Sequence, residues 1–368
     1  MIHILTHEYP PQKGGAGIYC RELALAASTI SRKVTVWAPS GSVKDSGINL
    51  IELPFSCSQS YFSSWNLIRK FKKFHFENVN KLVLHLAEPG STRAFVRFGF
   101  LISKEKRFIL TIHGSELLRF TRNPLERWLF KNLLLRCNRI HVLSRFNEKR
   151  LIALYPFTRR ILKRIPGAPA SGVTAKDQRA IRTNDRKAIQ IACVGRIHPR
   201  KGQDQILLAL LSLPEDMQKQ LVINFAGPNI DKRYLKKVQK LAKKFFGTVL
   251  FHGLCNDQEL TTIYAQADIF ALTSQPQPKS IEGFGFVYLE ASSYGLPIIA
   301  NKTGGVEDTV QDKVTGLLSE PNDIETLSKN FFTLISDENY RKKLGKNGIE
   351  WACSHDWQTT AKNLYSDL

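Results

Sequence analysis

Several features that mark particular classes of protein are missing from this sequence. Its six cysteines lie far apart, and none belongs to a C-x-x-C pair or to a paired Cys/His spacing. This pattern is typical of a reduced compartment and argues against a structural zinc site. An Asp-x-Asp pair is also absent, so the sequence predicts no divalent metal ion bound in that way.

Long hydrophobic runs are absent as well. The most apolar stretches, such as 82–86 and 108–112, are far shorter than the roughly 20 residues that a helix needs to cross a bilayer. The first residues, Met1 to Glu8, carry neither the basic leader nor the cleavage site of a signal peptide. We therefore expect a cytoplasmic protein without a transmembrane segment.

Acidic residues are scarce in the N-terminal half. Residues 1–170 contain 28 Lys and Arg against 10 Asp and Glu, whereas residues 171–368 contain 25 against 22. Most of the net charge of +21 therefore belongs to the first half. Such an excess favours an anionic partner, such as a lipid surface, a phosphorylated acceptor or a nucleic acid, although it also serves solubility.

Short β-branched runs alternate with longer amphipathic patterns along the chain, which is typical of βαβ units around parallel sheets. In the first half we predict strands at 2–6, 34–38, 82–86, 108–112 and 139–143, with helices such as 18–30 and 127–136. A second series has strands at 189–194, 221–226, 248–252, 268–272 and 297–300, and helices near 203–212, 232–246, 257–267 and 285–295.

The chain has 368 residues, and single cores rarely grow beyond about 250 to 300 residues. Between the two series, a stretch rich in Pro and Gly runs from Ile165 to Gly172 and is followed by polar residues as far as Lys187. We interpret this stretch as a linker and predict two domains, 1–170 and 171–355. Ligands of such sheets bind at the carboxyl ends of the strands, so we expect the chemistry in a cleft between the domains.

Two segments that follow predicted strands carry residues suited to bind phosphate. A glycine-rich loop with Gly14, Gly15 and Gly17 leads into the first helix, whose free N–H groups favour an anion. After the strand at 189–194, Arg196 offers a bidentate fork and Lys201 a point charge for a diphosphate. The structural alternatives are a common strand-to-helix turn and a solvated basic turn.

The densest motif runs from Glu282 through Phe284-Gly285-Phe286 to Glu290 and continues with Gly295-Leu-Pro297 and Gly304-Gly305-Val-Glu307. With its motifs in this order, the chain resembles the family-four retaining glycosyltransferases. Within that family it is somewhat similar to the mannosyltransferases. Other segments follow that family's order, among them Thr111-Ile-His113-Gly114, Val194-Gly195-Arg196 and Lys201-Gly202. The resemblance covers nearly the whole chain. It implies the α/β GT-B fold: two Rossmann-like domains facing each other across a cleft, with a last helix, 356–368, that packs back on the first domain.

The resemblance also implies roles for the residues of the 282–290 motif. Glu282 holds hydroxyls of the donor sugar near the reacting carbon, and Glu290 binds the ribose hydroxyls of the nucleotide. Backbone N–H groups of Phe284, Gly285 and Phe286 reach the sugar and the phosphates. An alternative for Glu290 is a cap or ion pair on a helix surface.

Further roles follow from the other matched segments. Arg196 and Lys201 match the pair that binds the diphosphate, and His113 matches a histidine that contacts the donor sugar and lines the acceptor side. Gly15 and Gly17 match the loop over the phosphates. For His113 the structural alternative is a strand-end histidine that bonds only to the backbone.

The reaction implied by the resemblance transfers a hexosyl group with retention of anomeric configuration. The donor is a nucleotide-diphosphate sugar, either GDP-mannose or a UDP-hexose, and it is a substrate, so no cofactor is expected. Cations and N–H dipoles stabilise the leaving diphosphate, so no metal is required. The sequence does not reveal the donor base, the acceptor hydroxyl or the oligomeric state.

An aromatic and basic segment, 61–76, has the composition of an amphipathic helix at a membrane interface. Together with the basic first half, it predicts a glycan or lipid-linked acceptor and a peripheral association with an anionic membrane, on its cytoplasmic face. The alternative is a solvated helix that buries Trp65 and Phe71.

Two other functions stay open at this point. A nucleotide-sugar epimerase or hydrolase can share the two-domain fold, although the epimerases lack the 282–290 motif as written. A nucleic-acid-binding protein is motivated by the pI of about 9.8 alone. No nucleic-acid motif is recognisable in the sequence, so nucleic acid is not an expected partner.

Overall fold

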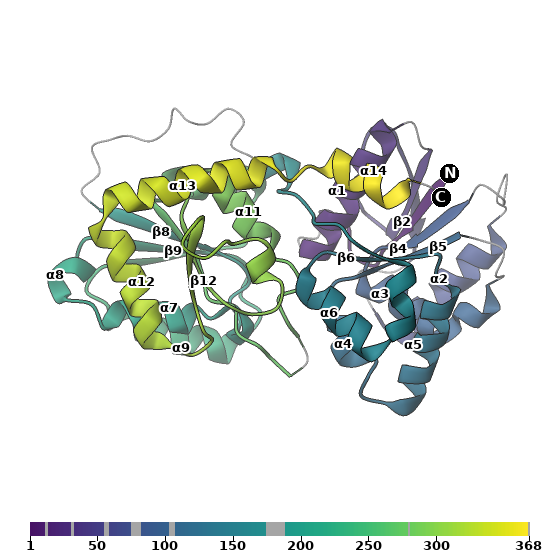
Figure 1. Ribbon diagram of the computed structural model, residues 1–368, viewed down its shortest axis with the longest axis horizontal. Coiled ribbons are helices and arrows are strands. Elements are labelled where there is room, and N and C mark those ends of the chain that lie inside the picture. The colour runs from purple at the N-terminus through teal and green to yellow at the C-terminus, as the bar shows by residue number, and fades with distance from the viewer. Residues whose placement is uncertain are drawn as a thin grey trace. The chain divides into compact units, whose positions relative to one another are not determined.

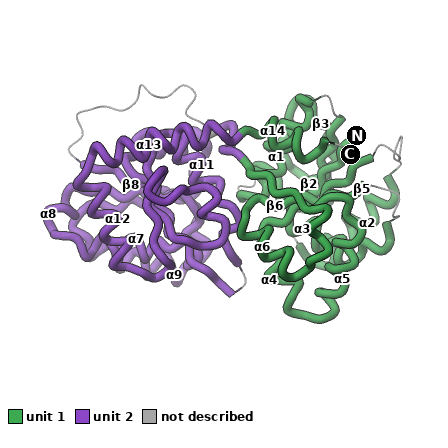
Figure 2. Tube along the Cα trace, in the orientation of Figure 1, with its two compact units in different colours: residues 1–167, 356–368 green, residues 168–355 purple. Residues whose placement is uncertain are grey.

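The computed structural model describes residues 1–11, 14–30, 33–54, 59–74, 82–102, 107–173, 188–278 and 280–366. The chain forms two compact units (Figure 2), which we call unit 1 (Met1–Gly167 with Asp356–Leu368) and unit 2 (Ala168–His355). The first unit ends three residues before the predicted boundary at 170. Residues 174–187 of the expected linker and residues 75 and 76 of the aromatic segment lie outside the described residues.

Unit 1 contains a seven-stranded parallel sheet in the order β3-β2-β1-β4-β5-β6-β7. Its strands are β1 (Ile2–Leu5), β2 (Val34–Pro39), β3 (Ile48–Leu53), β4 (Val83–Leu86), β5 (Arg107–Ile112), β6 (Arg139–Val142) and β7 (Leu162–Arg164). The central strands β1 and β4 are buried throughout, as expected for strands covered by helices on both faces.

The helices of unit 1 lie on both faces of this sheet (Figure 1). They are α1 (Gly15–Thr29), α2 (Tyr61–Lys73), α3 (Pro89–Phe98), α4 (Ser115–Arg119), α5 (Pro124–Arg136), α6 (Arg145–Leu154) and α14 (Trp357–Tyr365), with the 3-10 turns η2 (Gly99–Leu101) and η3 (Pro156–Arg160). Helix α1 packs against α14, and α3 packs against α2 and α5. The last helix of the chain therefore belongs to the first unit.

Unit 2 contains a six-stranded parallel sheet in the order β10-β9-β8-β11-β12-β13. Its strands are β8 (Ile189–Val194), β9 (Leu221–Ala226), β10 (Thr248–Gly253), β11 (Ile269–Leu272), β12 (Ile298–Asn301) and β13 (Gly316–Ser319). The helices are α7 (Gln203–Leu211), α8 (Glu215–Gln218), α9 (Lys232–Ala242), α10 (Asp257–Gln266), α11 (Phe286–Ser293), α12 (Ile324–Ser336) and α13 (Glu338–Cys353); the 3-10 turns are η4 (Ser171–Val173), η5 (Pro199–Lys201) and η6 (Val306–Asp308).

Local signals explain most of these boundaries. Asn123 accepts hydrogen bonds from the first N–H groups of α5, and Pro124 supplies the favoured first residue. Asp356 caps α14 in the same way. Helix α1 starts three residues before the predicted Ile18, because the extended Gly14 already serves as its N-cap. The predicted helix 232–246 ends at Ala242.

Several elements were not predicted from the periodicity, among them three strands and helix α12. Strand β3 is an edge strand whose residues, apart from the buried Leu53, are half-buried or exposed, and β7 has only three residues. Strand β13 and helix α12 follow the 282–307 motif. In each case the burial comes from neighbours that are distant in sequence, which a local pattern does not show.

Candidate active site

The densest cluster of charge in unit 2 lies where two neighbouring strands end. Lys201 Nζ is 2.6 Å and Arg200 Nη1 is 3.0 Å from Glu282 Oε2, and the Ser274 hydroxyl donates to the same oxygen at 3.0 Å. Arg200 and Lys201 follow β8, whereas Ser274 and Glu282 follow β11. Because β8 and β11 are adjacent in the sheet, their carboxyl ends bring the four side chains together.

Burial makes this ion cluster strong. The side chains of Arg200, Lys201 and Glu282 are 11%, 10% and 12% exposed. Burial by itself raises the pKa of Glu282, but the charges of Lys201 and Arg200 outweigh it and lower this pKa to about 2. Burial lowers the pKa of Lys201, and the Arg200 and Arg196 charges act in the same direction, while Glu282 opposes them. The carboxylate is therefore ionised at any pH near neutrality.

Arg200 was missed by the sequence analysis, which named Arg196 as the partner of Lys201. The structure leaves Arg196 exposed, and its backbone carbonyl accepts a hydrogen bond from Gln203. Three cations fall within six residues here, and only the turn geometry decides which of them face Glu282. That turn ends at Gly202, which has a φ of 70° and therefore a backbone conformation that favours glycine.

The glycines of the 282–307 motif fix the backbone around Glu282. The Gly305 N–H donates to the Glu282 carbonyl at 2.8 Å, and a Cβ on Gly304 would overlap that same carbonyl. Gly285 has a φ of 95°, and a Cβ there would clash with the ring of Tyr288. The spacing that carries the family resemblance thus has a steric basis in this chain.

The residues after Glu282 lead directly into helix α11. Gly285 is its N-cap and Phe286 its first residue, so the positive end of the helix dipole lies at this point, as expected for an anion site. Phe284 is buried, and its ring lies 5.2 Å from that of the half-buried Phe286. Glycine and turn geometry, more than the phenyl rings, make the N–H groups available.

Glu290 lies inside unit 2 and not on an exposed helix surface. It is 5% exposed, and its Oε2 accepts a hydrogen bond from the Tyr264 hydroxyl at 3.1 Å. The ring of Tyr264 stacks on Tyr294 at 5.4 Å. The structural alternative of a solvent-exposed ion pair is therefore wrong for this residue, and its carboxylate sits next to two aromatic rings.

In unit 1, the carboxyl ends of three adjacent strands carry polar groups. His7 follows β1, Glu88 follows β4 and His113 follows β5. Glu88 is fully buried and accepts hydrogen bonds from the backbone N–H groups of His7, Gly90 and Ser91 at 2.9, 2.6 and 2.5 Å. Burial raises the pKa of Glu88, but the hydrogen bond and charge of His7 and these N–H groups outweigh it, so the pKa is lowered.

His113 is held by its surroundings at one nitrogen. Its Nε2 lies 2.9 Å from the Ala87 carbonyl, which only accepts, so Nε2 donates. Its other nitrogen, Nδ1, is then the one that can accept a hydrogen bond. The backbone N–H of His113 donates to the buried Glu116 carboxylate at 3.1 Å, and the ring of Tyr19 packs edge-on at 5.0 Å. The alternative of a histidine that bonds only to the backbone therefore applies to Nε2 of His113.

The glycine-rich loop lies against an acidic residue that the sequence analysis did not consider. Gly15 begins α1, and a Cβ on Gly17 would contact the backbone of Glu8 at 3.2 Å. A Cβ on Gly14 would overlap the Glu8 carboxylate. A carboxylate at a helix N-terminus is electrostatically favourable, so a phosphate at this loop would have to displace Glu8.

A buried hydrogen-bond network, which the sequence did not reveal, connects α14 to the sheet. Tyr365 Oη lies 2.8 Å from His85 Nδ1, and His85 Nε2 lies 2.7 Å from Thr111 Oγ1. Thr111 Oγ1 and Tyr19 Oη each lie 3.0 Å from His141 Nδ1. Burial lowers the pKa of His141 to about 4, and burial also lowers that of His85, so both rings are neutral near pH 7.

The described residues contain no group of three or more His, Cys, Asp or Glu that could hold a metal ion. Within the same residues, no helix is long and apolar enough to cross a bilayer.

Comparisons with known proteins identify the family. The model of the family "Glycosyltransferase Family 4" matches residues 13–168, and that of "Glycosyl transferases group 1" matches residues 174–351. The chain belongs to glycosyltransferase family 4. It is 25% identical to the GDP-mannose-dependent alpha-(1-6)-phosphatidylinositol monomannoside mannosyltransferase of Mycolicibacterium smegmatis, with 98% of this chain and 96% of that protein covered.

Solved structures show the same fold for this family member. Sucrose-phosphate synthase from Thermosynechococcus elongatus superposes with a TM-score of 0.78 at 20% identity, covering 98% of this chain and 96% of that chain. WaaG, a glycosyltransferase of lipopolysaccharide biosynthesis, superposes with a TM-score of 0.73 at 16% identity, covering 100% of both chains. The fold is GT-B, as predicted, and the comparisons give no support to the epimerase or nucleic-acid-binding alternatives.

Proposed function

We propose that this glycosyltransferase transfers a hexosyl group, with retention, from a nucleotide-diphosphate sugar to a lipid-linked glycan acceptor. The observation that carries the proposal is the buried cluster of Glu282, Lys201 and Arg200 beside the N-terminus of α11. It combines a carboxylate that can accept from sugar hydroxyls with two cations and N–H dipoles suited to a diphosphate.

The roles follow from the charges. In the free protein the two cations neutralise Glu282. A bound diphosphate supplies its own negative charge to Lys201 and Arg200, which leaves Glu282 able to accept hydrogen bonds from the donor sugar. As the bond between the anomeric carbon and the phosphate oxygen breaks, charge grows on that oxygen, and the cations stabilise it without a metal ion. The acceptor hydroxyl attacks the same face, and its proton passes to the departing phosphate oxygen.

Other residues are assigned around this cluster. Glu290, already oriented by Tyr264, accepts from the ribose hydroxyls, and the N–H groups at Gly285 and Phe286 bind the phosphates. Arg196 adds positive charge near the diphosphate. His113 uses Nδ1 to accept from a hydroxyl of the sugar, because Nε2 is engaged by Ala87.

We assign GDP-mannose as the first donor to test, with a UDP-hexose as the alternative. The Mycolicibacterium smegmatis relative, aligned over nearly the full length of both chains, depends on GDP-mannose. Its acceptor is a phosphatidylinositol mannoside, which supports a lipid-linked acceptor here.

The surface of unit 1 supports a peripheral association with the cytoplasmic face of an anionic membrane. Tyr61, Phe62 and Trp65 of α2 are 66%, 71% and 43% exposed, and Leu125 and Trp128 of α5 are 63% and 59% exposed. The alternative that α2 buries both Trp65 and Phe71 is wrong for Trp65, although Phe71 is fully buried. Exposed aromatic side chains in a strongly basic domain are typical of proteins that bind at the lipid headgroup level.

A thermal-shift panel tests the donor site, because a ligand that binds only the native state raises the melting temperature. GDP and GDP-mannose should raise it for the wild type and for the exposed control Glu325→Gln. Lys201→Met and Glu290→Ala should abolish the shift, and Arg196→Ala should weaken it. An undiminished shift in Lys201→Met and Glu290→Ala would refute the assignment, and a shift with UDP alone would select the UDP-hexose alternative.

A further inference from the structure

A second basic and apolar surface lies in unit 2, at the edge of its sheet. It consists of helix α9, the residues that follow it and strand β10, and we call it the α9–β10 surface. Residues 232–256 contain seven Lys and Arg and no Asp or Glu. The surface is separate from the donor cluster, because β10 is the edge strand and Glu282 follows β11, three positions further along the sheet.

The packing of α9 directs most of these cations outward. Tyr234 and Val238 are buried, the Tyr234 hydroxyl donates to Asp204 Oδ1 at 2.7 Å, and Lys237 Nζ lies 2.6 Å from Asp204 Oδ2. These contacts with Asp204 hold one face of α9 against α7. The remaining six cations are exposed, and within the described part of the chain no carboxylate forms an ion pair with them: Lys232, Arg233, Lys236, Lys240, Lys243 and Lys244.

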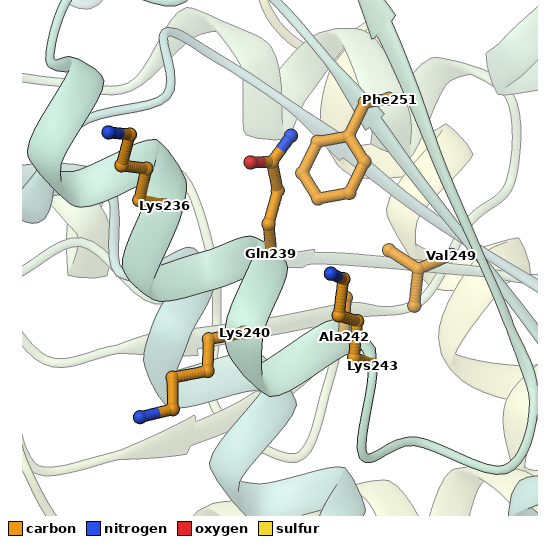
Figure 3. A pocket seen from close by; sticks show the side chains of 7 residues that line it. All are labelled: Lys236, Gln239, Lys240, Ala242, Lys243, Val249 and Phe251. Atoms are coloured by element: carbon orange, nitrogen blue, oxygen red, sulfur yellow. The ribbon is translucent and has the colours of Figure 1, made fainter.

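A pocket of about 630 Å³ opens between α9 and β10 (Figure 3). One wall carries Lys236, Gln239 and Lys243 of the helical segment, and the other carries Val249 and Phe251 of the strand. In Figure 3, Gln239 points from the helix toward the ring of Phe251. The pocket therefore offers an apolar wall beside positively charged groups, which suits a ligand with an anionic head and an apolar tail.

The apolar part extends beyond the pocket. Phe246, Leu250 and Leu254 are 56%, 42% and 66% exposed, and Phe251 is 37% exposed. Four large apolar side chains are exposed within nine residues, beside six cations that have no carboxylate partner among the described residues. These are the two components of an interfacial lipid-binding surface. Nucleic acid would also be attracted by the cations and can stack on the two phenyl rings, but Leu250 and Leu254 offer it no stacking surface, whereas acyl chains bury all four side chains.

We propose that the α9–β10 surface binds the anionic phospholipids of a membrane. A lipid phosphate lies against Lys236 and Lys243, and the adjoining chain lies along Val249 and Phe251. The cations around the pocket add attraction to neighbouring headgroups. This contact is additional to the one proposed for unit 1, and it does not depend on the identity of the sugar donor or acceptor.

Flotation of the full chain with vesicles of phosphatidylcholine, alone or mixed with phosphatidylglycerol, tests the proposal. Each Lys near an anionic surface contributes about fivefold to binding, so Lys236→Gln/Lys243→Gln should reduce partitioning to the anionic vesicles by tenfold or more. The matched control Lys343→Gln/Lys346→Gln removes two exposed lysines of α13 and should partition as the wild type. Equal partitioning of the two double variants would overturn the proposal.

A second variant tests the apolar component. Phe246→Gln/Leu254→Gln changes two exposed side chains and should reduce partitioning at a salt concentration that screens the lysines. No reduction would overturn lipid insertion at this surface. A single-stranded oligonucleotide gives the competing outcome: lysine-dependent binding to it, without lysine-dependent flotation, would identify a nucleic-acid surface instead.

Nucleotide binding separates this test from that of the proposed function. The Lys236→Gln/Lys243→Gln and Phe246→Gln/Leu254→Gln variants should keep the wild-type thermal shift with GDP-mannose, since neither changes the donor cluster. A chain that floats through the α9–β10 surface but binds no nucleotide sugar would refute the proposed function alone. A chain that binds the donor but floats independently of Lys236 and Lys243 would refute the lipid surface alone.

Discussion

Each unit holds a buried carboxylate at the carboxyl edge of its sheet, and the two are stabilised differently. Glu282 in unit 2 is neutralised by the side chains of Lys201 and Arg200. Glu88 in unit 1 is held by His7 and by three backbone N–H groups. Lys201 and Arg200 can exchange their ion pairs with Glu282 for ion pairs with an incoming diphosphate. Backbone N–H groups, in contrast, are fixed by the fold. From this difference we expect Glu282 to serve the reaction and Glu88 to serve the architecture.

The largest expected effect comes from Glu282→Gln. The amide cannot accept from the sugar hydroxyls as a carboxylate does, and it leaves two buried cations without their counter-charge, so kcat/KM should fall about 1000-fold, equivalent to about 4 kcal/mol. Steady-state assays with the donor identified above measure it. The exposed Glu325→Gln is the control and should retain wild-type activity. A loss smaller than tenfold in a folded Glu282→Gln protein would contradict the role of this carboxylate.

Glu88→Gln should act on stability instead. An amide N–H₂ would face backbone donors in a fully buried position, so the free energy of unfolding should fall by about 3 kcal/mol. Urea denaturation checks this, with the exposed Glu52→Gln as the control. Activity per folded molecule should change by only a few-fold. If activity collapsed while stability stayed unchanged, Glu88 would belong to the reaction and the contrast between the units would be wrong.

Mild acid should weaken unit 1 before it affects the Glu282 cluster. The pKa of His141 is lowered to about 4, against about 6.5 in an unfolded chain, so its neutral form stabilises the fold fully above pH 6.5. This stabilisation is lost as the pH falls from 6.5 toward 4, and the loss at pH 4.5 is about 2.5 kcal/mol. The Glu282 contribution is lost only as the pH falls from about 4.5 to about 2.

The comparison of pH 7 with pH 4.5 in urea titrations isolates this effect. His141→Gln retains a donor that can reach the Ile165 carbonyl but does not titrate, so its stability should depend less on pH than that of the wild type. Identical pH dependence of the two proteins would show that His141 does not contribute.

The smallest expected effect concerns the link between α14 and the sheet. Tyr365→Phe removes the hydroxyl that bonds to His85 and should lower the free energy of unfolding by about 1 kcal/mol. Tyr61→Phe, which changes an exposed ring, should leave stability unchanged. The same melting temperature for both variants would mean that the network does not stabilise the docking of α14.

The sequence supported a large part of the fold because parallel sheets have strong local signals. The runs at 189–194 and 221–226 are strands with the predicted bounds, since each is a mostly apolar run of six residues. Strand β3 was missed, because an edge strand with half-exposed residues resembles a loop in sequence. The motif from Glu282 to Glu307 could be recognised because close contacts require glycine at 285 and 304.

The sequence by itself determined the family, the two βαβ series and the strand ends at which Lys201, Glu282 and His113 lie. Only the tertiary structure decided which side chains meet. Arg200 joins Glu282 because β8 and β11 are neighbours, although 82 residues separate the two side chains in the sequence. His85 meets Tyr365 across 280 residues for the same kind of reason. Local periodicity specifies how a strand or helix forms, but the partner of a buried charge depends on sheet order, which no short segment contains.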